Sequence, residues 1–402
     1  MLTTGPRVVR RLVTVLALTT LMASAAADPA SAATVEGIPH FTHVVVLTLE
    51  NESASTTFAP GSPATYLNSL KAKGVFTPNY YGTGHVSLDN YIAMVSGQQG
   101  NPSTYSDCLG ISLYDCVQTT NVPSTSPGRS LADQLEEARL SWRQYSDGGT
   151  PAAPIGDCFH SPYSATDQSP DLYQGDSRTA PAYDYADRHV PFLYFANIVG
   201  NPTRCQAHLK GYQSLAADLA GNALPAFSFI TPDTCHDGHD TPCSDGSPGG
   251  LAGADAWLRT NVPPLLDYLA AHQGLLVINF DEGSPATTEP CSSCAGAGAG
   301  GRTGALFLSP LLAQGATVQT SYDHFSLLRT IEDSFGVTEH LNLANSANPM
   351  TEVFAGVPDP VVPEVPYPAI LLVAGLLLLA VFLRRRSTQS VARRGVATAH
   401  RR

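Results

Sequence analysis

Acidic residues, histidines and one serine stand where apolar stretches end along this chain of 402 residues. The run Val44–Leu49 stops abruptly at two polar residues, and the run Leu275–Phe280 ends at two adjacent carboxylates. The polar residues placed in this way are Glu50, Asn51, Ser87, Asp237, His239, Asp281, Glu282 and His324. Carboxylates and imidazoles are common ligands of divalent ions such as Zn²⁺, Mn²⁺ or Ca²⁺. The carboxylates and histidines of this set therefore predict a site for a divalent cation.

Each short motif also has a plainer interpretation. An Asp-Glu pair or an Asp-x-His triplet taken alone is more often part of a surface loop. A serine at the start of a helical pattern, as Ser87 is, most often caps the helix. For Glu50, a place beside a helix N-cap is as good an explanation as a metal ligand. Solvated loops do not explain, however, why all these residues follow buried strands or begin helices.

The apolar stretches indicate how these residues are positioned. Continuous apolar runs are typical of strands buried on both faces of a parallel sheet, and they predict strands over 43–49, 190–195, 226–230, 275–280 and 305–308. Helical spacing predicts helices after Ser87 and over 130–142, 212–219, 252–272 and 323–335, with a break at Pro263 and Pro264. We therefore expect an α/β fold with a mostly parallel central sheet and helices on both faces. Ligands of such sheets bind beyond the carboxyl ends of the strands, where the polar residues would meet.

Both ends of the chain look like targeting segments. Residues 1–33 combine three arginines, an apolar run and small residues, which predicts a secretory signal peptide. Residues 367–383 carry no charge and precede a tail, 384–402, with seven arginines and no acids. This pattern predicts one transmembrane helix with its basic tail in the cytoplasm. Prolines indicate a stalk over 346–366, so residues 34–345 form the domain that carries the site, on the extracellular face of the cell membrane.

The charge balance limits the partners. Between the predicted signal peptide and the tail lie 12 basic and 33 acidic residues, a net charge of −21. A domain this acidic is a poor binder of nucleic acid or of anionic membranes. It suits a cation site, although acidity can also simply keep an exported protein soluble. An anionic substrate would need at least one bound cation to approach it.

The eight cysteines all lie between the two targeting segments, which favours disulfides in an exported protein. Close spacing suggests the pairs Cys108–Cys116 and Cys235–Cys243, and the remaining four would give Cys158–Cys205 and Cys291–Cys294. The sequence does not determine this connectivity. The last two could instead be half of a zinc site, but no second Cys-x-x-Cys motif accompanies them.

The segments LENES, GHVSLDNYIAMVSG, FITPDTCHDGHD, INFDEG and DHFSLLRTIED resemble the bacterial phosphoesterase family that includes secreted acid phosphatases and phospholipases C. That family belongs to the alkaline phosphatase superfamily. The resemblance spans about 40–345 in the family's order, and it implies an alkaline-phosphatase-like fold with one or two divalent metal ions.

The resemblance also implies roles. Ser87 would be the nucleophile, Asn51 would contact the phosphate, and Asn90 would help to hold the phosphoryl oxygens. The implied metal ligands are Glu50, Asp237, His239, Asp281, Glu282 and His324. Relatives often have proline where this chain has Asp89, which adds a negative charge near an anionic substrate.

Four further residues are weaker candidates for a role in the site. His85 could donate a proton to the leaving group, or be a structural loop histidine. His189 could contact phosphate, although packing is the simpler role. Asp233 and His236 are spare candidates for metal ligands.

The expected function is hydrolysis of phosphate monoesters through a phosphoserine, with a phosphorylated small molecule or a phospholipid head group as substrate. A phospholipase C-type phosphodiesterase is the alternative within the family. A non-enzymatic, Ca²⁺-stabilised surface domain would explain the anchor and the charge but not Ser87. A Ser-His-Asp triad is disfavoured because no serine lies in a G-x-S-x-G motif.

Overall fold

The computed structural model describes residues 35–107, 128–160, 184–283, 290–296 and 300–357, which all belong to one compact unit, Ala33–Pro360. The predicted signal peptide, transmembrane helix and basic tail lie outside these ranges. Within the described ranges, no helix is both long and apolar enough to cross a membrane.

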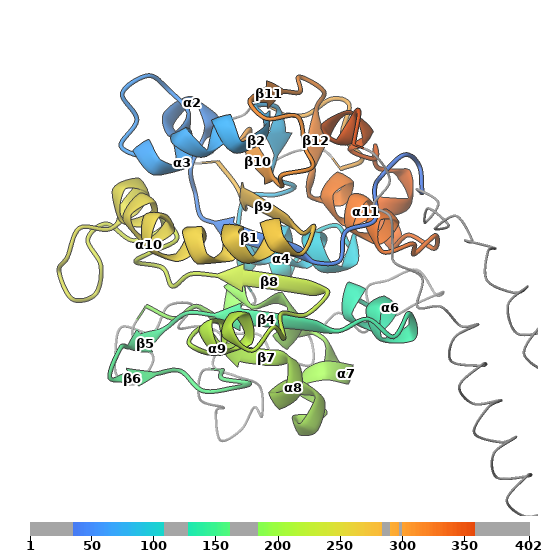
Figure 1. The fold of residues 1–402 in the computed structure, drawn as a ribbon. Helices are drawn as coiled ribbons and strands as arrows, with labels where there is room; N and C mark the ends of the chain where they lie inside the picture. Colours follow the sequence, from blue (N-terminus) through green and yellow to red (C-terminus); the bar gives the residue numbers. More distant parts are fainter. Residues whose placement is uncertain (1–34, 108–127, 161–183, 284–289, 297–299, 358–402) are drawn as a thin grey trace, which may run out of the picture. The chain divides into compact units, whose positions relative to one another are not determined.

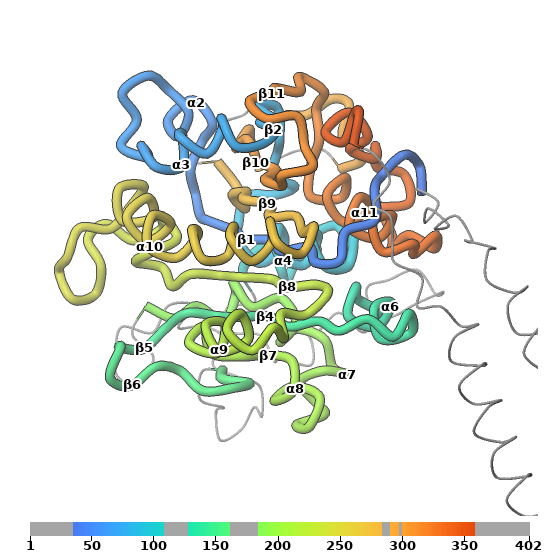
Figure 2. The backbone as a smooth tube through the Cα atoms, in the orientation of Figure 1, coloured from blue at the N-terminus to red at the C-terminus, as the bar shows by residue number. Residues whose placement is uncertain are grey.

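An eight-stranded sheet organises the described residues (Figure 1), and β1 lies inside it between β8 and β9 (Figure 2). In spatial order the strands are β11 (Ala316–Thr317), β2 (Gly74–Thr77), β10 (Ala305–Leu308), β9 (Leu275–Phe280), β1 (Val44–Leu49), β8 (Phe227–Thr231), β4 (Trp142–Ser146) and β7 (Leu209–Gly211). The five strands from β9 to β7 run parallel, whereas β10 is antiparallel to both of its neighbours. Two short ladders accompany the sheet, β3 (Tyr80–Tyr81) with β12 (Tyr322–Asp323) and β5 (Gly149–Thr150) with β6 (Ala153–Pro154).

Both faces of the sheet are covered. Alternate side chains of a strand point to opposite faces, and the β1 side chains on both faces are buried. Val44 and Val46 belong to one apolar cluster, whereas Val45, Leu47 and Leu49 belong to a second cluster. Helices α4 (Ser87–Ser96), α6 (Leu131–Glu137) and α11 (His324–Ser334) supply the first cluster; α3 (Thr65–Leu70), α9 (Ser214–Ala220) and α10 (Gly250–Ala271) supply the second. The predicted α/β architecture is confirmed.

Shorter elements fill the connections. They are the helices α2 (Ala54–Thr57), α7 (Ala196–Val199) and α8 (Pro202–His208), and the 3₁₀ turns η1 (Lys71–Lys73), η2 (Thr104–Ser106), η3 (Asp187–His189), η4 (Pro191–Tyr194), η5 (Asn342–Ser346) and η6 (Thr351–Phe354).

Three predicted elements differ from the structure. The apolar run 190–195 is buried but forms η4 rather than a strand; Pro191 begins the turn and has no N–H for a sheet ladder. The helix expected over 130–142 ends at Glu137, and Trp142 already belongs to β4. Helix α10 continues through Pro263 and Pro264 without the predicted break. Both prolines are half-buried or exposed, so carbonyls that lose their N–H partners can contact solvent.

The disulfide and stalk predictions have separate outcomes. The pairs Cys158–Cys205, Cys235–Cys243 and Cys291–Cys294 are confirmed, and Cys108–Cys116 lies outside the described residues. The predicted stalk boundary at residue 346 is too early, because Met350, Val353 and Phe354 are buried in the first apolar cluster. The apolar side chains between the prolines pack onto the domain, so the packed chain extends at least to Phe354.

Helix α11 contains a carboxyl group that is costly to ionise. Glu332 is fully buried; its Oε1 accepts a hydrogen bond from Leu341 N–H at 2.9 Å, and its Oε2 has no hydrogen-bond partner among the described residues. Burial, with a smaller contribution from neighbouring Asp333, raises the pKa of Glu332 to about 8. An unfolded glutamate titrates near 4.5, so between these pH values the folded protein keeps a proton that the unfolded chain releases. This contribution to stability is complete below about pH 4.5 and is lost as the pH rises towards 8.

We expect Glu332→Gln to raise the melting temperature by a few degrees at pH 8 and to change it little at pH 5. Glutamine keeps an acceptor for Leu341 N–H and never ionises, so it avoids the cost of a buried anion. Thermal melts by circular dichroism at the two pH values measure the effect. Glu339→Gln is the control because the Glu339 side chain is 76% exposed. Equal shifts for the two variants would contradict the assignment.

Candidate active site

The predicted site residues meet at the carboxyl edge of the sheet. Strand β1 is hydrogen-bonded to both β8 and β9, so the residues that follow these three strands are neighbours in space. Glu50 N–H donates to Asp237 O at 2.9 Å, and Asp281 N–H donates to Leu49 O at 2.9 Å. Segments about 190 and 230 residues away along the chain are thus joined to the end of β1 by backbone hydrogen bonds.

Helix α4 brings two hydroxyl groups to one carboxylate. Ser87 Oγ donates to Glu50 Oε2 at 3.1 Å, and Tyr91 Oη donates to Glu50 Oε1 at 2.6 Å. The two residues are four positions apart, so they lie on the same face of the helix. All three side chains are buried. Glu50 is therefore held in one orientation, with Oε2 directed at the predicted nucleophile.

His189 lies between two carboxylates without a hydrogen bond to either. Its Nε2 is 3.2 Å from Glu50 Oε1 and its Nδ1 is 3.2 Å from Asp237 Oδ2, but neither contact has hydrogen-bond geometry. Burial, with a smaller effect of the positive charge of Arg188, keeps the pKa of His189 well below its usual value. The neutral ring has a single N–H, so it cannot satisfy both carboxylates.

These three side chains offer the donor set that a divalent cation requires. One ligand atom from each of Glu50, His189 and Asp237 lies within 4.8 Å of the other two, and all three residues are buried. Asp281 Oδ2 is also buried and has no hydrogen-bond partner among the described residues. Two or three carboxylate oxygens with one imidazole nitrogen match the ligands of Zn²⁺ or Mn²⁺.

The carboxylates repel one another. Burial is the largest cause that raises the pKa of Glu50 well above its usual value, followed by the charges of Asp281 and Asp237. Burial likewise raises the pKa of Asp237 well above its usual value, that of Asp281 to about 6 and that of Glu282 to about 9. A bound cation would favour the ionised forms and offset this repulsion.

Two predicted histidine ligands have other partners in the structure. His324 Nδ1 lies 2.9 Å from the Tyr80 hydroxyl, and its Nε2 lies 2.6 Å from Asp281 O. The nitrogen that faces the carbonyl must carry the proton, so the other accepts from the tyrosine, and neither has a free lone pair. His239 Nε2 contacts Arg188 Nη2 at 3.1 Å instead of a carboxylate cluster. Both rings thus have protein partners in the structure, and the ligand roles of His239 and His324 stay predictions.

The predicted phosphate contacts also differ from each other. Asn51 has a left-handed backbone, which asparagine tolerates, and its N–H donates to Asp281 Oδ1 at 3.0 Å while its side chain stays half-buried. Asn90 instead uses both of its amide N–H groups on the carbonyls of Gly84 and Val86, and its Oδ1 accepts from Thr83 and Gly84. It braces the turn before Ser87 and has no donor left for phosphoryl oxygens.

His85 and Glu282 form the outer part of the site. His85 Nδ1 lies 3.0 Å from Glu282 Oε2, and the two side chains are 31% and 12% exposed. The pair is thus within reach of solvent, beside the buried cluster. Neither residue belongs to the group of three potential ligands around His189.

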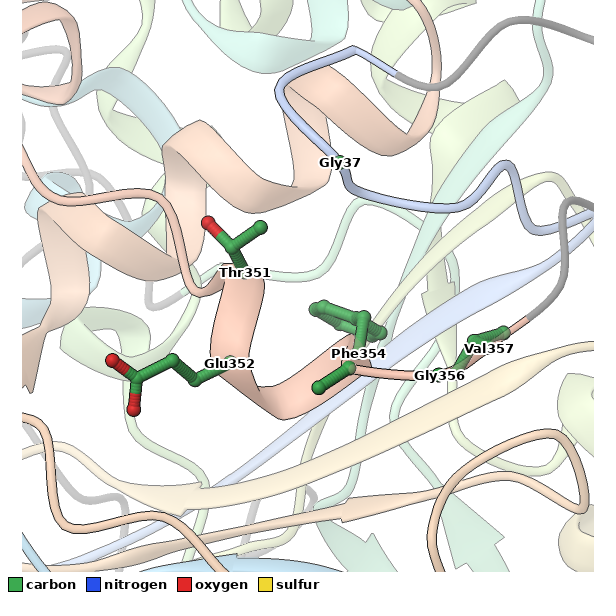
Figure 3. Close-up of a pocket in the computed structure, with 7 residues that line it drawn as sticks. Gly37, Thr351, Glu352, Phe354, Gly356 and Val357 are labelled. Atoms are coloured by element: carbon green, nitrogen blue, oxygen red, sulfur yellow. The ribbon is translucent and has the colours of Figure 1, made fainter.

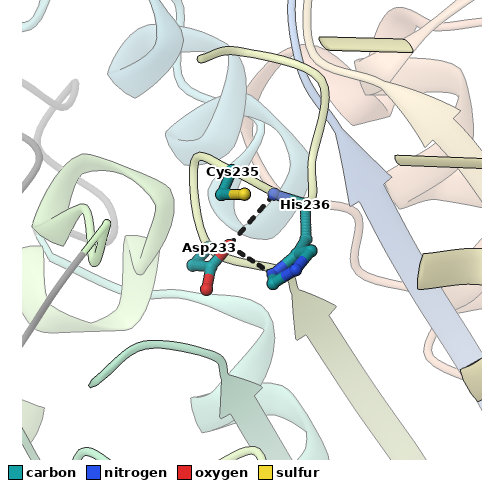
Figure 4. A group of neighbouring side chains, drawn as sticks. All are labelled: Asp233, Cys235 and His236. Atoms are coloured by element: carbon teal, nitrogen blue, oxygen red, sulfur yellow. Dashed lines mark hydrogen bonds and ion pairs between the residues drawn. The ribbon is translucent and has the colours of Figure 1, made fainter. Parts of the chain in front are cut away.

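The spare ligand candidates form a separate group (Figure 4). Asp233 and His236 make an ion pair at 2.7 Å, and Cys235 completes the group. Because Cys235 is bonded to Cys243, it has no thiolate to offer a metal. The group therefore lacks a third ligand.

A surface pocket of about 490 Å³ lies elsewhere on the domain (Figure 3). It is lined by Gly37 and by side chains of η6 and the residues after it, including Thr351 and Phe354. None of the predicted site residues lines it.

Sequence reasoning missed Tyr91 and Arg188 and gave His189 only a secondary role. The sequence feature that could have placed Tyr91 in the site is its spacing of four residues from Ser87, which puts both on one helix face. No local pattern distinguishes Arg188-His189 from other polar residues before an apolar run.

Comparisons with known proteins identify the family of this chain. The family model described as "Phosphoesterase family" matches residues 50–338. A probable acid phosphatase from Kluyveromyces lactis is 27% identical over 66% of this chain and 52% of its own length. An acid phosphatase from Aspergillus fumigatus is 25% identical over 67% of this chain and 50% of its own length.

The chain thus spans about half the length of these two curated relatives. A phosphatidylinositol-3-phosphatase from Mycobacterium tuberculosis is covered more fully, with 24% identity over 85% of this chain and 92% of the relative. Since the family model covers well over half of the residues, this chain belongs to the phosphoesterase family.

Proposed function

We propose that this protein is a metal-dependent phosphatase that hydrolyses phosphate monoesters through a phosphoserine at Ser87. The observation that carries the proposal is the placement of Ser87 Oγ 3.1 Å from Glu50 Oε2, beside a buried set of potential metal ligands. Ser87 is also the first residue of α4, where N–H groups and the helix dipole favour a phosphate. Membership of the phosphoesterase family supports ester hydrolysis as the reaction type.

Glu50, His189 and Asp237 would hold one ion, with the unpaired Oδ2 of Asp281 as a further ligand. Such an ion would supply positive charge that stabilises the serine alkoxide and the phosphoryl oxygens. The ligand set favours Zn²⁺ or Mn²⁺ over Ca²⁺, which prefers oxygen ligands alone.

The chain's own residues account for the proton transfers. Ser87 Oγ attacks phosphorus, and its proton passes to Glu50 Oε2, which already accepts the hydrogen bond from this hydroxyl and would be ionised beside a bound cation. The phosphorus–oxygen bond to the alcohol breaks as the new bond forms. His85, oriented by Glu282, donates the proton that the departing alcohol needs. Water then cleaves the phosphoserine and restores Ser87.

We infer that Asp89 adds little negative charge to this site. It is 2% exposed, and burial together with the charge of Glu282 raises its pKa well above the usual value. A neutral carboxyl group at this position is compatible with an anionic substrate. A neutral Asp89 would explain why this chain can have aspartate where related sequences often have proline.

Monoesters are favoured over diesters as substrates. The relatives named above include two acid phosphatases and a phosphatidylinositol-3-phosphatase, names that refer to phosphate monoesters. A phosphorylated small molecule or a phosphorylated lipid head group would both qualify. The predicted signal peptide and C-terminal anchor, with the three disulfides, support a location on the extracellular face of the membrane.

We expect Ser87→Ala to lower turnover of p-nitrophenyl phosphate by about 10³-fold or more, because no covalent intermediate can form. Ser96→Ala is the matched control. Ser96 is a buried serine at the other end of the same helix, and its Oγ donates to Ile92 O at 2.7 Å. Quenched-flow labelling with a ³²P-ester should detect phosphoserine in the wild-type protein and in Ser96→Ala but not in Ser87→Ala. Normal turnover of Ser87→Ala would exclude the nucleophile assignment, and full activity after chelation would exclude metal dependence.

A second prediction concerns how Glu50 is held. Tyr91→Phe should weaken binding of Zn²⁺ or Mn²⁺ to the metal-free protein about 10-fold or more, because Glu50 Oε1 loses its hydrogen-bond donor. Isothermal titration calorimetry measures the dissociation constant for each ion. Tyr145→Phe is the control, since the buried Tyr145 donates to Asp218, outside the site, at 2.6 Å. Equal metal affinity in the two variants would show that Tyr91 does not position the ligand.

A further inference from the structure

We propose that Arg188 binds the phosphoryl group of the substrate and is oriented for this by His239 and Asp240. The inference rests on the proposed function and names a residue of the site that neither the sequence motifs nor the family membership assigns. Its basis is a chain of hydrogen bonds on the loop after β8, together with the charge around Arg188.

The hydrogen-bond chain determines the protonation of His239. A guanidinium group can only donate, so the contact of 3.1 Å from Arg188 Nη2 makes His239 Nε2 the acceptor. The ring proton is therefore on Nδ1, which lies 2.9 Å from Asp240 Oδ1 and donates to it. The other oxygen of Asp240 accepts from the Thr234 hydroxyl at 2.8 Å. Each group in this chain holds the next, from the Thr234 hydroxyl through Asp240 and His239 to Arg188.

The backbone places Arg188 beside the proposed metal ligands. It lies in η3, directly before His189, whose ring contacts Glu50 and Asp237. His239 is tied to the same place, because its N–H donates to Asp237 Oδ1 at 2.8 Å. Arg188 is 8% exposed, so its charge acts where solvent screens little.

The charge of Arg188 reaches much of the acidic site. It lowers the pKa values of Glu50, Asp107, Asp237 and Glu282, against the effect of their burial. A monoester dianion that enters the site adds two negative charges to this cluster of carboxylates. A positioned guanidinium can contact two phosphoryl oxygens at once, which makes arginine a better phosphate ligand than a mobile cation.

This arrangement favours monoesters over diesters. A diester carries one negative charge and one fewer free phosphoryl oxygen, so it gains less from a bidentate donor. Loss of Arg188 should therefore harm monoester hydrolysis more than diester hydrolysis. The competing explanation is that Arg188 only balances the carboxylates and never contacts substrate.

The two explanations predict opposite changes in two binding constants. If Arg188 binds phosphate, Arg188→Gln weakens inhibition by inorganic phosphate about 10- to 100-fold, the usual range for a charged hydrogen bond. The affinity for Zn²⁺ or Mn²⁺ then stays unchanged or becomes tighter, because the substitution removes the positive charge of Arg188 from the neighbourhood of the metal. If Arg188 only maintains the structure of the acidic cluster, the substitution weakens metal binding, and phosphate inhibition falls no further than metal occupancy does.

The experiment uses the full-length metal-loaded protein and its Arg188→Gln, Arg188→Lys and Arg204→Gln variants. Arg204 is the matched control because it is mostly buried and pairs with Asp133 and Glu136 at 2.9 and 3.0 Å, outside the site. The measurements are the inhibition constant of inorganic phosphate, metal affinity by calorimetry, and kcat/KM for p-nitrophenyl phosphate and bis(p-nitrophenyl) phosphate. We expect monoester kcat/KM to fall about 100-fold in Arg188→Gln and diester kcat/KM to stay within about 3-fold.

Other results would overturn the inference. An unchanged phosphate inhibition constant in Arg188→Gln, or equal losses for monoester and diester, would exclude a phosphate contact. If Arg188→Gln does not melt cooperatively, Arg188→Lys decides: it keeps the charge but not the bidentate donor, so phosphate inhibition should weaken about 10-fold at unchanged metal affinity. A wild-type protein that hydrolyses no ester would refute the proposed function itself, whereas an active wild type with an unaffected Arg188→Gln would refute only this inference.

Discussion

The structure depends on the burial of several carboxylates at one edge of a parallel sheet. Glu50, Asp237 and Asp281 follow three adjacent strands, and all three are completely buried. Ionised carboxylates in such a place repel one another and lose hydration, which is why burial raises their pKa values. The folded chain tolerates the arrangement through backbone hydrogen bonds to these residues and through one arginine nearby. The remaining imbalance is what makes the site suited to a cation and then to a phosphate.

Helix α4 converts this electrostatic site into a candidate catalytic one. Its first residue, Ser87, and the residue one turn later, Tyr91, both donate to Glu50, so helix and strand are joined through one side chain. The turn before the helix is braced by Asn90, and the N–H of Leu88, the second residue of the helix, donates to Asp107 Oδ1 at 2.9 Å. The proposed nucleophile is thereby held between a helix and a strand, as a reaction that requires defined geometry demands.

Two histidines show why residue type alone does not assign a role. His189 has no satisfied hydrogen bond although it lies between two carboxylates, which is the pattern of a metal ligand. His239 has both nitrogens engaged, one with Arg188 and the other with Asp240. The two rings are close, with centroids 6.2 Å apart, yet their partners differ completely. Only contacts with residues distant in the sequence distinguish the two histidines, because each lies in a short polar segment.

The sequence by itself determined the parallel α/β sheet, because continuous apolar strands such as Val44–Leu49 and Leu275–Phe280 need cover on both faces. It also determined which polar residues collect at the carboxyl edge, since Glu50 and Asp281 directly follow those strands. Only the tertiary structure decided the partners: that His189 lies between Glu50 and Asp237, that His239 contacts Arg188 and His324 contacts Tyr80, and that Asn90 supports a turn. These roles depend on contacts between segments as many as 244 residues apart, and local patterns of hydrophobicity carry no information about such contacts.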